Sequence, residues 1–216
     1  MLTYELQLPA APADGAPLIV LLHGRGSNRH DLAGLRPHLP REAILVTPEA
    51  PFPAAPWGYG PGSAWYRLVS DGVPDEASMT ASLEQLAELL EALPGALPVA
   101  PGPLALGGFS QGGTMSMAFA LTRSGSVPRI VNLSGVVPRH PAVTVSPATV
   151  AGTRFFWGHG TSDAAVPFDL ATEGRAALEA AGADLASFDY PMGHGVSPAE
   201  LRDLRAWLDD TGDIQS

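Results

Sequence analysis

Short apolar runs alternate with longer amphipathic segments along this chain, and this alternation restricts the fold more than any other feature. The runs "APLIVLLHG" and "AILVTPEA" are continuously apolar, which is typical of strands buried on both faces of a sheet. The segment "SMTASLEQLAELLEAL" instead repeats its leucines at helical spacing. Because strands that alternate with helices of about ten to fifteen residues form a parallel sheet covered by those helices, the sequence predicts an α/β fold.

The same reading places the elements along the chain. We expect helices at 31–39, 78–93, 113–123, 168–182 and 197–210, the first with Asp31 as its N-cap, and strands at 4–8, 16–24, 43–50, 103–108, 129–135, 153–160 and 183–191. Residues 50–77 are rich in Pro, Gly and aromatic residues, so we expect a long loop there. No linker separates two cores, which predicts a single domain over 1–216 with a frayed end at 211–216.

Composition excludes several classes of protein. The net charge of −10 argues against nucleic-acid binding, which depends on cationic contacts to phosphate. The chain has no cysteine and no lysine, so disulfides, thiolate metal sites and Schiff-base chemistry are excluded. It shows neither a run of about 18 apolar residues nor a basic, then apolar, leader. We therefore expect a cytoplasmic protein. We also expect a monomer or weak homodimer that acts on a small molecule and has no metal site.

Ser110 lies between two pairs of glycines, in "GGFSQGG". A flexible surface turn would explain such glycines, and so would a sharp bend that projects a nucleophile. "GFSQG" matches the G-x-S-x-G nucleophile elbow and falls between a predicted strand and a predicted helix, where that motif belongs. Its position favours the elbow.

A nucleophilic serine needs a base and an acid that orients the base. Asp163 and His194 each follow a predicted strand and precede a predicted helix, in the chain order Ser, Asp, His. The carboxyl ends of parallel strands lie at one edge of a sheet, so we expect the three residues to meet there as catalytic residues. His159, four residues before Asp163, is the main alternative base, and Asp163 could instead merely cap a turn.

"LLHGRGSN" ends the first buried strand in the manner of an oxyanion loop. We expect the backbone N–H groups of Arg25 and Gln111 to form the oxyanion hole, and His23 to brace the loop. The Arg25 side chain could favour acidic or phosphate-bearing substrates. The residues expected to line the substrate pocket are Trp65, Tyr66, Val166 and Met192.

Two other classes of function stay open at this point. A metal-dependent hydrolase could use His159, Asp163 and His194 as ligands, although this would leave the serine elbow unexplained. A non-catalytic binding protein could also be built on a hydrolase fold, since a fold alone does not establish activity.

Taken together, five segments resemble the phospholipase/carboxylesterase family of α/β-hydrolases, which includes bacterial carboxylesterases and acyl-protein thioesterases. These segments are "LLHGRGSN", "SAWYRL", "GGFSQGGTMS", "WGHGTSDAAVP" and "YPMGHGVSPAELRDLRAWL". The resemblance implies an α/β-hydrolase fold with helices on both faces of the sheet. It also implies a cofactor-free, cytosolic serine hydrolase with Ser110 as nucleophile, Asp163 as acid and His194 as base.

The resulting functional prediction is a hydrolase of carboxylic esters, or of thioesters, that works through an acyl-enzyme. We expect a carboxylesterase for short to medium acyl chains. The alternatives within the family are a lysophospholipase and an acyl-protein thioesterase.

Overall fold

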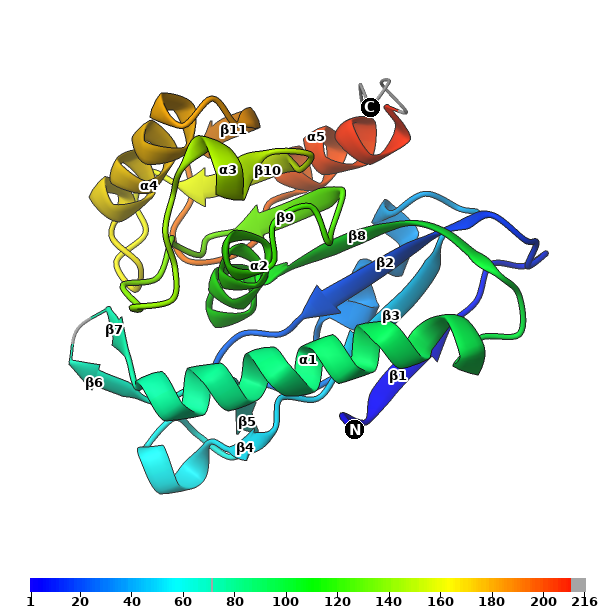
Figure 1. Ribbon diagram of the computed structural model, residues 1–216, viewed down its shortest axis with the longest axis horizontal. Coiled ribbons are helices and arrows are strands. Elements are labelled where there is room, and N and C mark those ends of the chain that lie inside the picture. The colour runs from blue at the N-terminus through cyan, green and yellow to red at the C-terminus, as the bar shows by residue number, and fades with distance from the viewer. Residues whose placement is uncertain (71, 211–216) are drawn as a thin grey trace.

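A seven-stranded sheet forms the centre of the protein, whose computed structural model describes residues 1–70 and 72–210 (Figure 1). The strand order is β1-β3-β2-β8-β9-β10-β11, with all neighbours parallel except β1, which pairs antiparallel with β3. The strands are β1 (Tyr4–Gln7), β2 (Ala16–Leu22), β3 (Ile44–Pro48), β8 (Pro101–Phe109), β9 (Arg129–Leu133), β10 (Arg154–Gly160) and β11 (Asp184–Tyr190). The predicted α/β fold with a mostly parallel sheet is confirmed.

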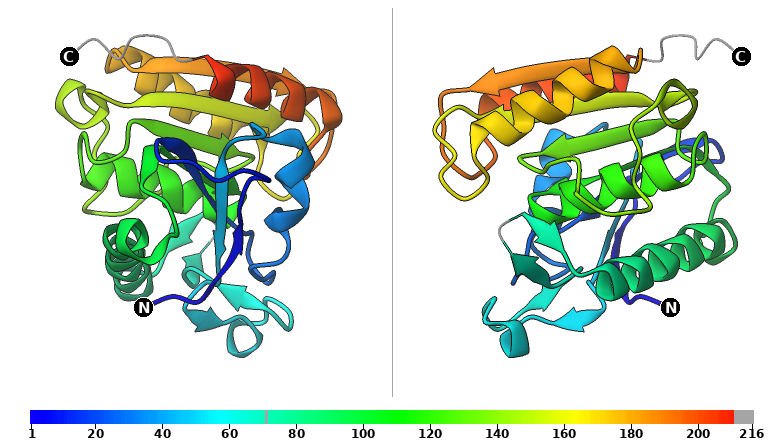
Figure 2. Two further views of the ribbon diagram at one scale, coloured as in Figure 1. Left: turned by 90° about the vertical axis from the view of Figure 1, so that its right-hand side faces the viewer. Right: turned by 60° about the vertical axis from the view of Figure 1, so that its left-hand side comes forward.

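Helices cover both faces of this sheet. One face carries α1 (Glu76–Ala96), α2 (Gln111–Thr122), α3 (Pro147–Val150) and α4 (Phe168–Ala180), and the other carries the 3₁₀-helix η1 (Leu32–His38) and α5 (Pro198–Asp209). The right-hand view of Figure 2 shows α1, α2 and α4 in front of the sheet. Among the described residues, no helix is long and apolar enough to cross a membrane.

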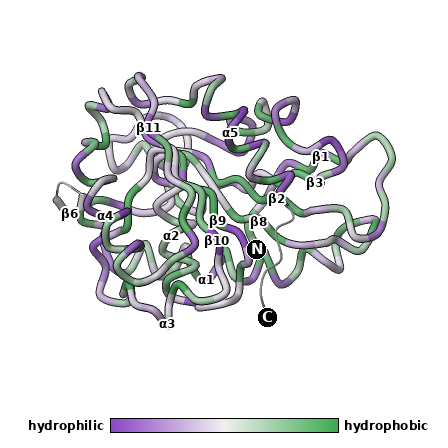
Figure 3. The backbone as a smooth tube through the Cα atoms, turned by 90° about the horizontal axis from the view of Figure 1, so that it is seen from above, coloured by the Kyte–Doolittle hydropathy of each residue, from purple (hydrophilic) through white to green (hydrophobic). Residues whose placement is uncertain are grey.

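Each strand supplies both layers of the core because successive side chains point to opposite faces. In β2, Leu18, Val20 and Leu22 pack against the α1 and α2 layer, whereas Ile19 and Leu21 pack against the η1 and α5 layer. This explains why the strand has to be apolar without interruption. Figure 3 shows the same distribution, with hydrophobic residues along the central strands and hydrophilic residues mainly in the outer segments.

Several details differ from the sequence predictions. The helix expected at 31–39 is the 3₁₀-helix η1, and Asp31 does not cap it, because its carboxylate accepts a hydrogen bond from Ser27 Oγ at 2.7 Å. The helix α1 starts earlier than expected because Asp75 accepts a hydrogen bond from the Ser78 N–H and so acts as the N-cap. The prediction of a frayed end at 211–216 lies outside the described residues.

The long loop at 50–77 also contains regular structure. It forms two small antiparallel pairs and one short 3₁₀-helix: β4 (Phe52–Pro53) with β5 (Ser63–Ala64), β6 (Leu68–Ser70) with β7 (Val73–Pro74), and η2 (Ala55–Trp57). An isolated bridge between Ser27 and Ser63 ties this region to the loop after β2. The loop is therefore attached to the carboxyl edge of the sheet, which faces left in Figure 1.

Candidate active site

The bend between β8 and α2 places Ser110 at the carboxyl edge of the sheet. Its backbone has φ 54° and ψ −115°, a left-handed conformation that is strained for a residue with a Cβ. The glycines around it permit close packing, since a Cβ on Gly112 would overlap the carbonyl oxygen of Leu22 at the end of β2. The first turn of α2 thus packs directly on β2. The bend at Ser110 is therefore tight and closely packed, and it is not a flexible surface turn.

The predicted acid, base and nucleophile meet at this edge. Nε2 of His194 lies 2.9 Å from Oγ of Ser110, and Nδ1 of His194 donates to Oδ2 of Asp163 at 2.7 Å. The second contact fixes the histidine with its proton on Nδ1, which leaves Nε2 as an acceptor for the serine hydroxyl. The ring of Phe109 packs against the imidazole with a centroid separation of 4.8 Å and helps to hold it in place.

Asp163 is buried and held as a carboxylate. Its Oδ1 accepts hydrogen bonds from the N–H groups of Ala165 at 2.9 Å and Val166 at 2.8 Å, while Oδ2 accepts from His194. Burial by itself would raise the pKa of Asp163, but the hydrogen bonds from Val166 and His194 outweigh it, so the pKa lies below its usual value. The residue therefore caps a turn and orients the histidine at the same time.

His159 occupies a different position from the one that a general base requires. It is fully buried, its Nε2 donates to the carbonyl of Val166 at 2.9 Å, and it lies 3.6 Å from Oδ2 of Asp163. Burial lowers its pKa, although the Val166 carbonyl and the Asp163 charge oppose this. The serine hydroxyl contacts His194 instead. Within 1–70 and 72–210, no group of three or more His, Asp or Glu side chains is arranged to hold a metal ion.

Two backbone N–H groups lie beside the serine. Gly24, in the loop after β2, is so close that a Cβ there would lie 3.6 Å from Cβ of Ser110, and Arg25 follows it. Gln111 is the first residue of α2, where an N–H has no acceptor within the helix. Neither the Arg25 nor the Gln111 N–H donates to another acceptor in the described part of the chain.

His23 braces the oxyanion loop, as expected. Its Nδ1 donates to the carbonyl of Gly24 at 2.8 Å, and its Nε2 accepts from the N–H of Ala50 at 3.1 Å. Burial lowers the pKa of His23, which keeps the ring neutral in this bridging arrangement.

The side chain of Gln111 has a role that sequence analysis missed. Its Oε1 accepts from the N–H of Trp65 at 2.8 Å, and its Nε2 donates to the carbonyl of Tyr66 at 2.7 Å. The indole N–H of Trp65 in turn donates to the carbonyl of His23 at 2.9 Å. Residues 65–66 therefore join the serine turn to the oxyanion loop. No local sequence pattern signals this connection, because it joins a buried side-chain amide to two backbone groups far away in the sequence.

The residues predicted to line the pocket are in three kinds of surroundings. Trp65 is fully buried in the core and its indole N–H donates to the carbonyl of His23, so the prediction that it lines the substrate pocket is wrong. Tyr66 is nearly as deeply buried, at 5% exposure. Val166 and Met192 are half-buried beside Asp163 and His194 in sequence, and their contact with substrate stays a prediction.

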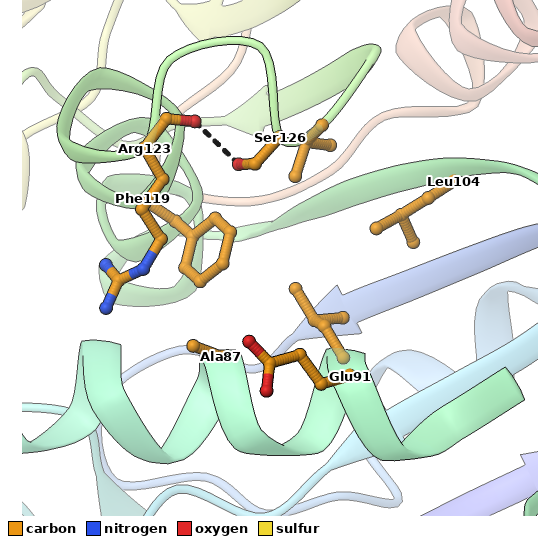
Figure 4. Close-up of a pocket in the computed structure, with 8 residues that line it drawn as sticks. Ala87, Glu91, Leu104, Phe119, Arg123 and Ser126 are labelled. Carbon is orange, nitrogen blue, oxygen red and sulfur yellow. Dashed lines mark hydrogen bonds between the residues drawn. The ribbon is translucent and has the colours of Figure 1, made fainter. Parts of the chain in front are cut away.

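A separate groove of about 230 Å³ lies between α1 and the far end of α2 (Figure 4). Its lining includes Glu91 on α1 and Phe119 and Arg123 on or next to α2. Phe119 is nine residues after Ser110, a rise of roughly 13 Å along the helix. The groove is therefore not part of the serine site.

Comparison with known proteins points to one family. Residues 6–211 match the model of the family described as Phospholipase/Carboxylesterase. An acyl-protein thioesterase 1 of Cryptococcus neoformans is 28% identical over 88% of this chain and 90% of its own length. The carboxylesterase of Bacillus cereus has a similar structure, with a TM-score of 0.83 and 22% identity over 97% of this chain and 94% of that one.

A third similar protein is acyl-protein thioesterase 2 of Zea mays, whose structure gives a TM-score of 0.77 and 23% identity over 95% of this chain and 97% of that one. These structural likenesses establish the fold, and the family match extends over nearly the whole chain. The chain therefore belongs to the phospholipase/carboxylesterase family of hydrolytic enzymes.

Proposed function

We propose that this enzyme hydrolyses carboxylic esters by a Ser-His-Asp mechanism with an acyl-enzyme intermediate. The observation that carries the proposal is the unbroken hydrogen-bond chain from Ser110 through His194 to Asp163. Strained backbone at the serine supports it, since strain of this kind is concentrated at functional sites.

In the first step, Nε2 of His194 takes the proton of Ser110 as Oγ attacks the acyl carbon. The carboxylate of Asp163 stabilises the imidazolium that forms, and its low pKa keeps it charged. The imidazolium then protonates the leaving alcohol or thiol, which gives the acyl-serine. A water molecule, deprotonated by His194, attacks the acyl-serine and releases the acid.

The backbone N–H groups of Arg25 and Gln111 stabilise the oxyanion of each tetrahedral intermediate. Both flank Ser110, and neither is used by another acceptor among the described residues. Two donors fixed in advance at the developing negative charge supply a large part of the rate enhancement in this kind of reaction.

Short to medium acyl chains are the proposed substrates. The burial of Trp65 and Tyr66 supports this, because two large side chains that would have lined a long acyl pocket belong to the core instead. The similarity to acyl-protein thioesterases keeps a thioesterase or lysophospholipase activity as the alternative.

The test is a rate profile on 4-nitrophenyl esters from acetate to palmitate, with wild type and Ser110→Ala measured side by side. We expect a maximum at short or medium chains and a loss of at least about a thousandfold in kcat for the variant. Circular dichroism and thermal unfolding check that the variant stays folded. A maximum at long chains would favour the lysophospholipase or thioesterase alternative. Wild-type turnover in folded Ser110→Ala would overturn the mechanism, and a wild type without esterase activity would favour a binding protein.

A further inference from the structure

We propose that the Arg25 side chain is an anion subsite, which directs the enzyme towards esters that carry a second, negatively charged carboxylate or phosphate group near the scissile bond. This inference rests on the proposed esterase function and adds the substrate class. Position, fixation and charge of the guanidinium support it.

Arg25 starts beside the reacting atoms. Its neighbour Gly24 lies against Ser110, and its own N–H belongs to the proposed oxyanion hole. The residue is exposed, so its side chain extends from this point into solvent at the carboxyl edge of the sheet. A charged group on a bound substrate would not need to extend far from the ester to reach it.

The guanidinium is held in place by an aromatic ring. Cζ of Arg25 lies 4.6 Å from the ring centroid of Tyr59, and the Tyr59 hydroxyl accepts a hydrogen bond from the N–H of Leu68 at 2.7 Å. The guanidinium lies over the ring, and its N–H edge donates no hydrogen bond to an acceptor within residues 1–70 and 72–210. This edge is the part that binds a carboxylate or phosphate with two parallel hydrogen bonds.

Among the residues that the structure describes, no carboxylate forms an ion pair with this charge. Arg25 takes part in none of the ion pairs within residues 1–70 and 72–210, whereas Arg29 pairs with Glu5 and Arg67 pairs with Asp75. This occurs in a chain with 22 acidic residues and a net charge of −10. A stacked, unpaired arginine beside the nucleophile is suited to an anion that arrives with the substrate.

The charge also acts within the site. Burial raises the pKa of the Tyr66 hydroxyl, and a hydrogen bond with Thr114 and the positive charge of Arg25 oppose this rise. Thr114 in turn hydrogen-bonds to the carbonyl of Ser110 at 3.2 Å. The guanidinium is thus close enough to influence groups that contact the serine turn.

Two matched pairs of esters test the proposal, one for each side of the ester bond. On the acyl side, mono-4-nitrophenyl glutarate is compared with its methyl ester, in which a neutral methyl ester replaces the second carboxylate. On the leaving-group side, 4-(butyryloxy)benzoate is compared with its methyl ester. The readout is the ratio of kcat/KM for the charged over the neutral ester, after subtraction of uncatalysed hydrolysis. The ratio is taken within each variant. If a substitution displaces the Arg25 N–H, the effect on kcat/KM is the same for both esters and cancels in the ratio.

In at least one of the two pairs, we expect the ratio of kcat/KM for the charged over the neutral ester to be higher in wild type than in Arg25→Gln. The expected difference is about five- to tenfold, as for a partly exposed charge-assisted contact. Arg25→Lys should retain part of the preference, since it keeps the charge but not the planar fork. Tyr59→Leu, which removes only the stack, should lower the ratio less than Arg25→Gln. Raising NaCl should reduce the wild-type ratio because salt screens the charge.

Ratios in Arg25→Gln that equal those of wild type in both pairs would overturn the proposal. A wild-type ratio that does not change with NaCl concentration would also overturn it, and this measurement needs no variant. Either result would leave the esterase mechanism intact. Absence of any Ser110-dependent ester turnover would instead count against the proposed function itself, so the two failures are distinguishable.

Discussion

At the scale of single residues, Gln111 contributes to the site through two different parts. Its N–H lies at the start of α2 beside Ser110, and its side-chain amide holds Trp65 and Tyr66 by their backbone groups. Since Trp65 also bonds to the carbonyl of His23, this one amide links the two segments that supply the proposed oxyanion donors. The side chain is therefore a positioning group.

Replacement of this amide tests that role. Gln111→Met keeps the approximate size but leaves the Trp65 N–H and the Tyr66 carbonyl without partners, at a cost of about 1–3 kcal/mol each in unfolding free energy. We expect kcat to fall about ten- to a hundredfold with little change in KM, because the loss falls on the transition state. Steady-state kinetics and denaturant unfolding measure the two effects.

Ser82→Ala is the matched control, since Ser82 Oγ donates to the Trp65 carbonyl from α1 and does not contact the serine turn. We expect it to lower stability with a much smaller effect on kcat. If both variants reduced kcat in the same proportion to their loss of stability, the amide would be only a structural support.

At the scale of elements, α5 begins with a buried acid. Ser197 and Glu200 form a capping box, and Glu200 is fully buried in the structure. The pKa of Glu200 is raised to about 7, mainly by burial and to a smaller extent by the charge of Asp203 on the same helix, although the Ser197 N–H and the charge of Arg175 on α4 oppose the rise. The folded pKa thus lies above the reference value of 4.5.

This shift has a defined sign. Between pH 4.5 and about 7, the folded state holds a proton that the unfolded state has released. The free energy of unfolding therefore falls as the pH rises through this range. Glu200→Gln keeps an acceptor for the Ser197 N–H and removes the titration. We expect wild type to lose about 3 kcal/mol relative to this variant between pH 4.5 and 8, from the size of the shift. Denaturant midpoints of both proteins across this range are the measurement, and a difference that stays constant with pH would refute it.

The sequence predicted the strands and major helices because their burial patterns are local. Continuous apolar runs identified β2 and β3, and leucines at helical spacing identified α1. Local pattern did not identify η1 as a 3₁₀-helix. It also did not find the short strand pairs in 50–77, because these depend on contacts with the loop after β2.

The candidate site divides in the same way. The proximity of Ser110, Asp163 and His194 could be predicted because parallel strands place their carboxyl ends at one edge. The burial of Trp65 and the amide contacts of Gln111 could not, since they depend on how a distant loop packs against α2.

At the scale of the whole molecule, one sheet serves two core layers and one functional edge. Its strands place side chains in the α1 to α4 layer and in the η1 and α5 layer, and the single domain over 1–216 stays a prediction. Loops after β2, β8, β10 and β11 supply the proposed triad and the two proposed oxyanion donors, so the chemistry depends on the register of four separate strands.

Ser110 is the proposed nucleophile that His194 and Asp163 activate. The most direct measurement is reaction with a fluorophosphonate, which forms a stable phosphorus–oxygen bond to an activated serine as fluoride leaves, followed by peptide mass spectrometry. We predict one adduct per chain, on Ser110, with loss of esterase activity in proportion to labelling, and labelling at least about a hundredfold slower in His194→Ala. An adduct at another residue, or an active enzyme that is not labelled at Ser110, would contradict the account.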